Sequence, residues 1–277
     1  MKPDLLMLNT PPNQPTAKHS HVIKLFPMIV AKALAAVVLV LMLAYIAGMV
    51  YEKMYYPEPS TLAYRLIRGF DMNWEENVPA FFSTAILLLA SLLLFAVYHL
   101  KSSYKAERRK WGILSIVFLF MAVDESLQIH EYVSEVVRPM LVSDLSGLLY
   151  WAWVVPYGVL VLAAVAFFLP FVWSLPLKTR TLFITSGAMF VAGALGLELF
   201  EGYFYVRYGY DHIYNLVLYC MEEVLEMSGV VLFIYALLDY MVLLKAQVLF
   251  VPGKHKEGLV EQLFHSQETD VAARPKV

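Results

Sequence analysis

The sequence has little cysteine and little charge, and these shortages exclude several classes of protein. Cys220 is the only cysteine in 277 residues, which excludes a disulfide scaffold and a cysteine-rich zinc or iron–sulfur site. Charged residues make up 16% of the chain, against about 25% in an ordinary soluble domain. The 21 basic and 23 acidic side chains leave a formal net charge of −2. Without a basic excess, we expect no nucleic-acid partner.

Apolar residues are abundant instead, and their distribution predicts a helical membrane protein. They form 60% of the chain, and the mean hydropathy is +0.63. A transmembrane helix needs about 20 mainly apolar residues, and six segments qualify without the alternation typical of barrel strands. We therefore predict an all-α bundle, a polytopic membrane protein with about six transmembrane helices. The predicted spans are 33–51 (with a start as early as Leu25), 79–99, 111–133, 148–172, 181–205 and 213–244.

Lysine and arginine fall unevenly on the two sides of these spans. If the N-terminus is cytoplasmic, 16 of the 21 basic residues lie on the inner side, in agreement with the positive-inside rule. The outer side holds Lys53, Arg65, Arg68, Arg138 and Arg207. We accordingly expect both termini in the cytoplasm, with tails at 1–24 and 246–277 around a membrane domain at 25–245. A mixed apolar and charged stretch at 60–77 suggests an interfacial helix on the outer face.

Acidic residues occur inside the predicted spans, where a charged side chain costs roughly 2.5–3.5 kcal/mol at mid-helix. The eight acids within or at the edge of three spans are Asp124, Glu125, Glu131, Glu198, Glu201, Glu222, Glu223 and Glu226. Helical spacing lets each span offer one acidic face, with Asp124, Gln128 and Glu131 on a single stripe that Glu135 extends. At a rise of about 1.5 Å per residue, all three groups fall in the outer half of the bilayer. This shared depth predicts one site.

The predicted site needs counter-charge that the spans do not contain. No lysine or arginine lies at that depth, and His130 is the one basic group among the eight acids. Eight carboxylates cannot all be ionised together in a low dielectric, so metal ions or shared protons must balance them. Oxygen-rich ligands with one imidazole favour an Fe or Mn type of divalent ion, with Zn or Ca as alternatives. Di-iron and di-manganese bundles use similar ligands, but through a Glu-x-x-His motif that this chain lacks.

The candidate metal ligands are therefore the eight acids and His130. Gln128 is expected to hydrogen-bond to a ligand rather than bind the ion, and His130 could instead hydrogen-bond to a carboxylate. Asp211 and His212, in the outer loop before the sixth span, are weak candidates because a solvated turn explains them better. Glu131 and Glu201 lie near the outer boundary, where a solvent-facing role is the competing interpretation.

Two further groups on the same side have ordinary structural explanations. Glu75 and Glu76 precede the second span, where the helix dipole favours negative charge. An aromatic belt, or else a wall of an apolar substrate cavity, explains Tyr150, Trp151, Trp153 and Tyr157 at the start of the fourth span. Neither group enters the set of candidate ligands.

Three stretches carry a resemblance to a known group of proteins. They are DESLQIHE at 124–131, GALGLELFEG at 193–202 and EEVLEMSG at 222–229. Together they resemble an uncharacterised family of bacterial multi-pass membrane proteins, over about Trp111 to Leu244. The resemblance implies a similar fold and a place in the bacterial inner (cytoplasmic) membrane, and it brings no activity with it.

Three functions remain open from the sequence. The first is a metal-dependent membrane enzyme, an oxidoreductase or a hydrolase, acting on a lipid-like or other apolar substrate. The second is a transporter or channel for divalent cations or protons, because intramembrane acids mark ion paths, although no inverted repeat or proline-broken helix appears. The third is a structural subunit whose polar network specifies packing. The partner expected in every case is membrane lipid.

Overall fold

Long helices form nearly all of the chain that the computed structural model describes, residues 26–58, 60–101, 105–141 and 147–244. No strand occurs in these ranges. Five segments are long and apolar enough to cross a membrane, and a bent pair of helices meets the same test when the two are taken as one span. The predicted all-α bundle of a polytopic membrane protein is confirmed. The predicted tails at 1–24 and 246–277, together with Leu25 and Lys245, lie outside the described residues.

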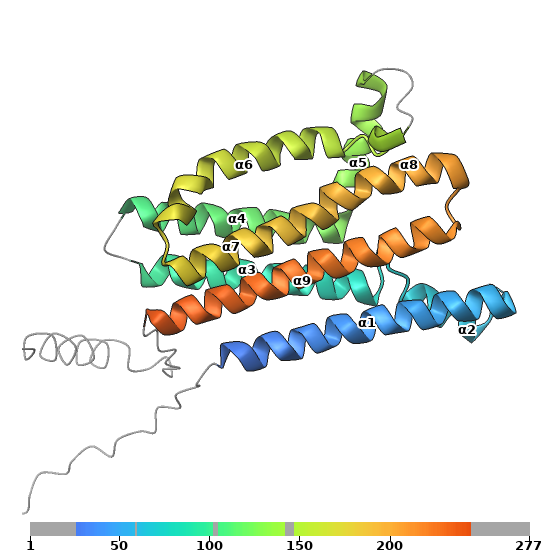
Figure 1. Ribbon diagram of the computed structural model, residues 1–277, viewed down its shortest axis with the longest axis horizontal. Coiled ribbons are helices and arrows are strands. Elements are labelled where there is room, and N and C mark those ends of the chain that lie inside the picture. Colours follow the sequence, from blue (N-terminus) through green and yellow to red (C-terminus); the bar gives the residue numbers. More distant parts are fainter. Residues whose placement is uncertain (1–25, 59, 102–104, 142–146, 245–277) are drawn as a thin grey trace, which may run out of the picture. The chain divides into compact units, whose positions relative to one another are not determined.

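The long helices run back and forth (Figure 1). Their bounds are α1 Pro27–Tyr55, α2 Leu62–Gly69, α3 Val78–Leu100, α4 Lys105–Leu127, α5 Ile129–Val137, α6 Val154–Ser174, α7 Leu177–Val191, α8 Glu198–Tyr208 and α9 Ile213–Leu243. Turns of 3-10 helix occupy Arg138–Met140 and Gly147–Leu149, and a π-helical segment, Ala192–Leu197, joins α7 to α8. The helix expected within 60–77 is α2, which is shorter than that stretch.

α9 is the central helix, and it packs against α1, α3 and α7. Figure 1 shows α1 on one side of α9 and the α7–α8 helix on the other. From Met227 to Met241 nearly all residues of α9 are buried, and the partly exposed ones form a narrow stripe of Ser228, Leu232, Tyr235 and Asp239. This half of α9 is therefore enclosed on most of its sides, as expected of a central helix.

Aromatic side chains fill one end of the bundle. We call it the basic end, because α3 and α9 end there, α4 and α7 begin there, and it carries Lys101, Lys110, Lys178 and Arg180. The fully buried Trp111 ring stacks on Tyr240 with centroids 5.2 Å apart. Its other contacts are edge-to-face with Phe171 at 5.0 Å and Phe183 at 5.9 Å. These rings pack closely against one another in the interior at this end.

The third predicted span is broken into two helices. α4 ends at Leu127, Gln128 adopts a left-handed backbone with φ 55° and ψ 38°, and the following helix turns away by 79°. Asp124 Oδ1 accepts the backbone N–H of His130 at 2.9 Å, which satisfies a donor in the first turn of α5. The single stripe expected from Asp124 through Gln128 to Glu131 and Glu135 is therefore wrong, because residues on the two sides of the break belong to different helices.

The fifth predicted span is continuous but carries the π-helical segment. Gly193 in this segment lies directly against α9, where a Cβ atom would stand 2.9 Å from Glu226 Cγ and 3.0 Å from the Glu222 carbonyl oxygen. Glycine is required at this close approach. Segments of π-helix occur frequently at functional sites, and this one ends where Glu198 begins α8.

Candidate metal centre

Two groups of three side chains each hold their ligand atoms within 4.8 Å of one another. The glutamate group, from α8 and α9, is Glu198, Glu201 and Glu222. The histidine group, from the loop before α3 and from α5, is Glu75, His130 and Glu131. Carboxylate oxygens and imidazole nitrogens bind a divalent metal ion such as Zn²⁺ at about 2.0–2.2 Å. Each group is therefore compact enough to bind one ion after small side-chain movements.

The glutamate group lies where the π-helical segment meets α9. Glu198 and Glu201 are one turn apart on α8, and the close approach of Gly193 brings Glu222 alongside them. Glu198 Oε1 accepts a hydrogen bond from Trp153 Nε1 at 3.0 Å. Glu201 is 3% exposed, and its Oε1 has no hydrogen-bond partner in the described part of the chain. The solvent-facing interpretation of Glu201 is therefore wrong, and this buried oxygen needs a proton or a cation.

In the histidine group, the imidazole of His130 lies between two carboxylates. Its Nε2 is 3.4 Å from Glu75 Oε1, and its Nδ1 is 3.4 Å from Asp124 Oδ2. The ring also packs against Trp153, with centroids 5.1 Å apart. Glu75 Oε2 is buried and has no hydrogen-bond partner among the described residues, whereas Glu131 is exposed.

Asp124 orients the histidine. Its Oδ1 accepts two hydrogen bonds of 2.9 Å, from the His130 backbone N–H and from the Tyr157 hydroxyl. Its Oδ2 faces Nδ1 of the same imidazole. A metal-binding histidine usually gives its second ring N–H to a carboxylate or carbonyl, and Asp124 stands in that position.

The remaining acids connect the two groups electrostatically. Glu223 lies within electrostatic range of Glu75 and Glu201, and Glu226 lies within electrostatic range of His130 and Glu198. Within the described ranges, no lysine or arginine forms an ion pair with any of the eight acids of the spans. The arrangement is a concentrated set of carboxylates with one imidazole as its basic group.

Three residues considered from the sequence stand apart from both groups. Gln128 forms the break between α4 and α5, and the structure gives its side chain no hydrogen bond to a candidate ligand. His212 begins α9, where its Nδ1 accepts the backbone N–H of Tyr214 at 3.3 Å. Asp211 is exposed, and its carbonyl accepts a hydrogen bond from Lys53 Nζ. The contacts of Asp211 and His212 are those of a surface turn.

The structure adds residues that the sequence interpretation assigns elsewhere. Asn77, rather than Glu75, caps α3 by accepting the N–H of Ala80 at 3.2 Å, and Glu75 faces His130 instead. Trp153 precedes α6 and hydrogen-bonds to Glu198, so it does more than form an interfacial belt. The sequence indicated the role of Trp153 only through its spacing of four residues from Tyr157, near the depth of the acids. That spacing fits an interfacial aromatic belt as well as it fits a site.

Comparison with known proteins gives a family and no activity. No curated protein and no solved structure matches the chain. A family described as Domain of unknown function (DUF8692) matches residues 30–241, a range that contains both groups of candidate ligands. Because this match covers most of the chain, the protein belongs to the DUF8692 family.

Proposed function

We propose that this membrane protein binds divalent metal ions at the glutamate group and the histidine group. The observation that carries the proposal is a buried carboxylate oxygen without a hydrogen-bond partner among the described residues of each group, Glu201 Oε1 and Glu75 Oε2. Each oxygen comes from a residue whose group holds its ligand atoms within 4.8 Å of one another. A cation would satisfy these oxygens and supply the positive charge that no nearby lysine or arginine supplies.

The donor atoms favour an Fe or Mn type of ion, with Zn or Ca as alternatives, because carboxylate oxygens outnumber the single imidazole. Two groups allow two ions, in the manner of di-iron and di-manganese carboxylate bundles. His130 would bind through Nε2, since Asp124 faces Nδ1. Glu223 and Glu226, in neither group, are available to share or move a proton.

We infer that the protein is an enzyme, an oxidoreductase or a hydrolase, acting on a lipid-like or other apolar substrate. A bound ion would supply the activation of water or dioxygen that such a reaction needs. The residues next to two of the ligands, Phe200 beside Glu201 and Met221 beside Glu222, are apolar and exposed. An apolar surface around the site would suit an apolar molecule that reaches it from the bilayer.

The charge distribution supports a location in the cytoplasmic membrane, with both termini inside and the carboxylates in the outer half of the bilayer. The resemblance of the stretches at 124–131, 193–202 and 222–229 supports a bacterial inner membrane. Membrane lipid is the expected partner.

Elemental analysis of the detergent-purified protein, with an optical spectrum under air, tests the metal proposal. We expect stoichiometric iron or manganese in the unmodified protein and its loss from Glu201→Gln and Glu222→Gln. Glu135→Gln is the matched control, because Glu135 is exposed and belongs to neither group. If the protein contains no metal and gains none on reconstitution with Fe²⁺ or Mn²⁺, the proposal fails. Folding defects in the Glu→Gln variants would then favour a structural subunit.

Transport is the second candidate, and helix geometry favours it. The break at Gln128 and the π-helical segment interrupt two spans near the carboxylates, and carriers commonly bind ions at interrupted helices. The close-packed rings around Trp111 at the basic end count against a continuous path. Uptake of Mn²⁺ into proteoliposomes that Glu222→Gln abolishes and Glu135→Gln retains would rank transport first.

A further inference from the structure

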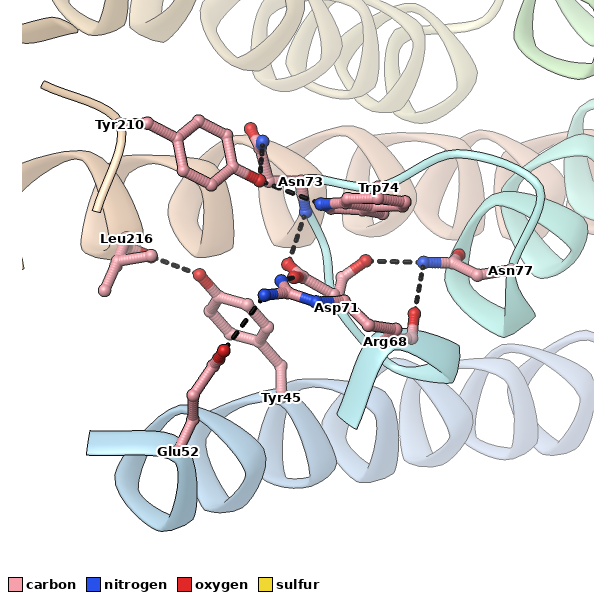
Figure 2. Close-up of polar contacts among 9 residues, drawn as sticks. All are labelled: Tyr45, Glu52, Arg68, Asp71, Asn73, Trp74, Asn77, Tyr210 and Leu216. Atoms are coloured by element: carbon pink, nitrogen blue, oxygen red, sulfur yellow. Dashed lines mark hydrogen bonds and ion pairs between the residues drawn. The ribbon is translucent and has the colours of Figure 1, made fainter. Parts of the chain in front are cut away.

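A second polar site lies where α1 ends, beside α2 and the start of α9. It is a cavity of about 150 Å³ whose walls include the loop before α9 (Figure 2 shows some of the polar contacts around it). An engineered cavity of about this volume holds benzene, so the space suits a small group of roughly six to eight heavy atoms. The chemistry of its lining comes mainly from Tyr45, Glu52, Lys53, Tyr56, Tyr210 and Asp211.

An ion network fixes one wall of this cavity. Arg68 Nη2 lies 2.9 Å from Glu52 Oε1 and Nη1 lies 2.5 Å from Asp71 Oδ2, which ties α2 to α1 and to the loop before α3 (Figure 2). Burial acts to lower the pKa of Arg68, but hydrogen bonding with Tyr64 and the charges of Glu52 and Asp71 outweigh it and raise that pKa. The guanidinium therefore stays charged, and it holds both carboxylates in fixed positions.

Lys53 and Tyr210 have hydrogen-bond donors left over. Lys53 Nζ donates to the Asp211 carbonyl at 3.0 Å, and its other two N–H groups have no protein partner in the described ranges. The Tyr210 hydroxyl accepts hydrogen bonds from Asn73 Nδ2 at 2.8 Å and Trp74 Nε1 at 3.0 Å, and no described residue accepts its own proton. Burial raises the pKa of Tyr210, so this proton is kept. Both donors suit a phosphate oxygen.

The same lining also suits a cation. Glu52 Oε2 takes no part in the ion pair with Arg68, and the Asp211 carboxylate adds a second negative group. Three aromatic side chains, Tyr45, Tyr56 and Tyr210, belong to the lining, and aromatic rings attract ammonium groups. The formal charges of the lining residues Glu52, Lys53, Arg68, Asp71 and Asp211 sum to −1. This balance disfavours a simple anion and favours a small group that carries both signs of charge.

We propose that the cavity binds the headgroup of a zwitterionic, amine-bearing phospholipid of the outer leaflet. The phosphate contacts the donors of Lys53 and Tyr210. The ammonium contacts the carboxylates of Glu52 and Asp211 and the faces of the tyrosine rings. This site needs no metal ion, so the proposal is independent of the function proposed above and is tested separately from it.

The surroundings of the cavity match a lipid rather than a free solute. On α1, Val50 and Met54 follow the lining residues Met49 and Lys53 in sequence and have exposed apolar side chains, against which acyl chains can lie. α2 is strongly amphipathic, with Leu62 and Leu66 exposed on a helix that also carries Arg65, as expected of a helix at the membrane interface. By the positive-inside rule the basic end faces the cytoplasm, which assigns this opposite side of the bundle to the outer leaflet.

Native mass spectrometry of the full chain tests the assignment by counting retained lipid. The protein is equilibrated in mixed micelles with a phosphoethanolamine lipid or a phosphoglycerol lipid of identical acyl chains. We expect preferential retention of the phosphoethanolamine lipid, because an anionic headgroup meets a lining of charge −1. Equal retention of the two lipids, or preference for phosphoglycerol, overturns the proposal.

Two variants and two matched controls connect the preference to the cavity. Asp211→Asn should reduce the preference roughly fivefold, the value of one exposed ion pair of about 1 kcal/mol. Lys53→Gln should reduce retention of both lipids, since both contain phosphate. The controls Glu58→Gln and Arg65→Gln alter exposed charges outside the lining and should change neither quantity. Equal effects in variants and controls would show nonspecific surface binding.

Soluble O-phosphoethanolamine distinguishes a lipid site from a site for free solutes. It contains the proposed headgroup without acyl chains, so we expect it to displace bound lipid only at a large molar excess. Displacement at stoichiometric concentration would overturn the assignment to lipid.

Discussion

The carboxylates of the site differ in what their individual oxygens contact. Both oxygens of Asp124 face protein groups, namely the His130 N–H and Tyr157 hydroxyl at Oδ1 and the imidazole at Oδ2. Glu201, by contrast, has a buried oxygen with no partner in the described part of the chain. The difference separates a carboxylate that positions another residue from one that is available to a ligand.

Asp124→Asn should weaken metal binding about 10–100-fold and leave the fold intact. Asparagine keeps an acceptor for the His130 N–H and for Tyr157, but it places an amide where a carboxylate now faces Nδ1. The imidazole then loses the charge that orients and polarises it. Calorimetric titration of the metal-free protein with Mn²⁺ measures the change.

Tyr157→Phe is the control for that variant. It removes one hydrogen bond to the same carboxylate, worth about 1 kcal/mol, and retains the charge beside His130. We expect lower thermal stability with little change in Mn²⁺ affinity. An equal loss of affinity in both variants would mean that Asp124 acts through folding and not through the imidazole.

Single residues of the site could be predicted where their chemistry conflicts with their surroundings. An acid such as Glu222 stands out because charge inside an apolar run is costly. Glu75 does not stand out, because it lies in a loop and its direction depends on which neighbour caps α3. Asn77 takes that role, and only the folded chain brings Glu75 to His130.

At the scale of helices, two irregularities of the backbone position the candidate ligands. The left-handed Gln128 turns α5 away from α4 and places His130 beside Glu75, and the π-helical segment sets Glu198 and Glu201 against α9. Irregular backbone of this kind persists when surrounding contacts fix it, and it is common at functional sites. The hydrogen bond from His130 N–H to Asp124 is one such contact.

Gln128→Gly should stabilise the fold by about 0.5–1 kcal/mol, because glycine adopts the left-handed conformation without the penalty that a side chain adds. Ser126→Gly, two residues earlier inside α4, should instead destabilise it by about 1 kcal/mol. Thermal unfolding in detergent, followed by circular dichroism, measures both. If both variants are destabilised alike, Gln128 is helical and the break lies elsewhere.

The spans themselves could be predicted because an apolar run fixes a membrane helix directly. The sixth was expected at 213–244 and is 213–243, and the second was expected at 79–99 and is 78–100. The third was expected as one helix, because no glycine or proline, the usual causes of a kink, occurs between Gly112 and Pro139. The spacing of apolar residues gives no indication that a glutamine adopts a left-handed backbone.

Across the whole molecule, the two ends of the bundle have opposite character. The basic end is filled by rings around Trp111, while the candidate ligands and the cavity beside α1 lie away from it. Under both proposals, the substrate, ion or lipid headgroup would therefore reach its site from one side of the membrane. The function of both sites therefore depends on which side the basic end faces.

Single-cysteine labelling determines that orientation, and the chain offers a closely matched pair of positions for it. In a Cys220→Ala background, which removes the only native cysteine, Leu62→Cys and Leu177→Cys each replace the first residue of a helix. Leu62 is 72% exposed and Leu177 is 69% exposed, so their accessibility to a reagent is nearly equal.

We expect a membrane-impermeant maleimide added to intact spheroplasts to label Leu62→Cys, and to label Leu177→Cys only after permeabilisation. The physical reason is the positive-inside rule, because the basic residues that flank α4 and α7 resist transfer across the membrane. The reverse pattern would place the metal groups and the headgroup cavity in the cytoplasmic half of the bilayer, and their substrates would then come from the inner leaflet.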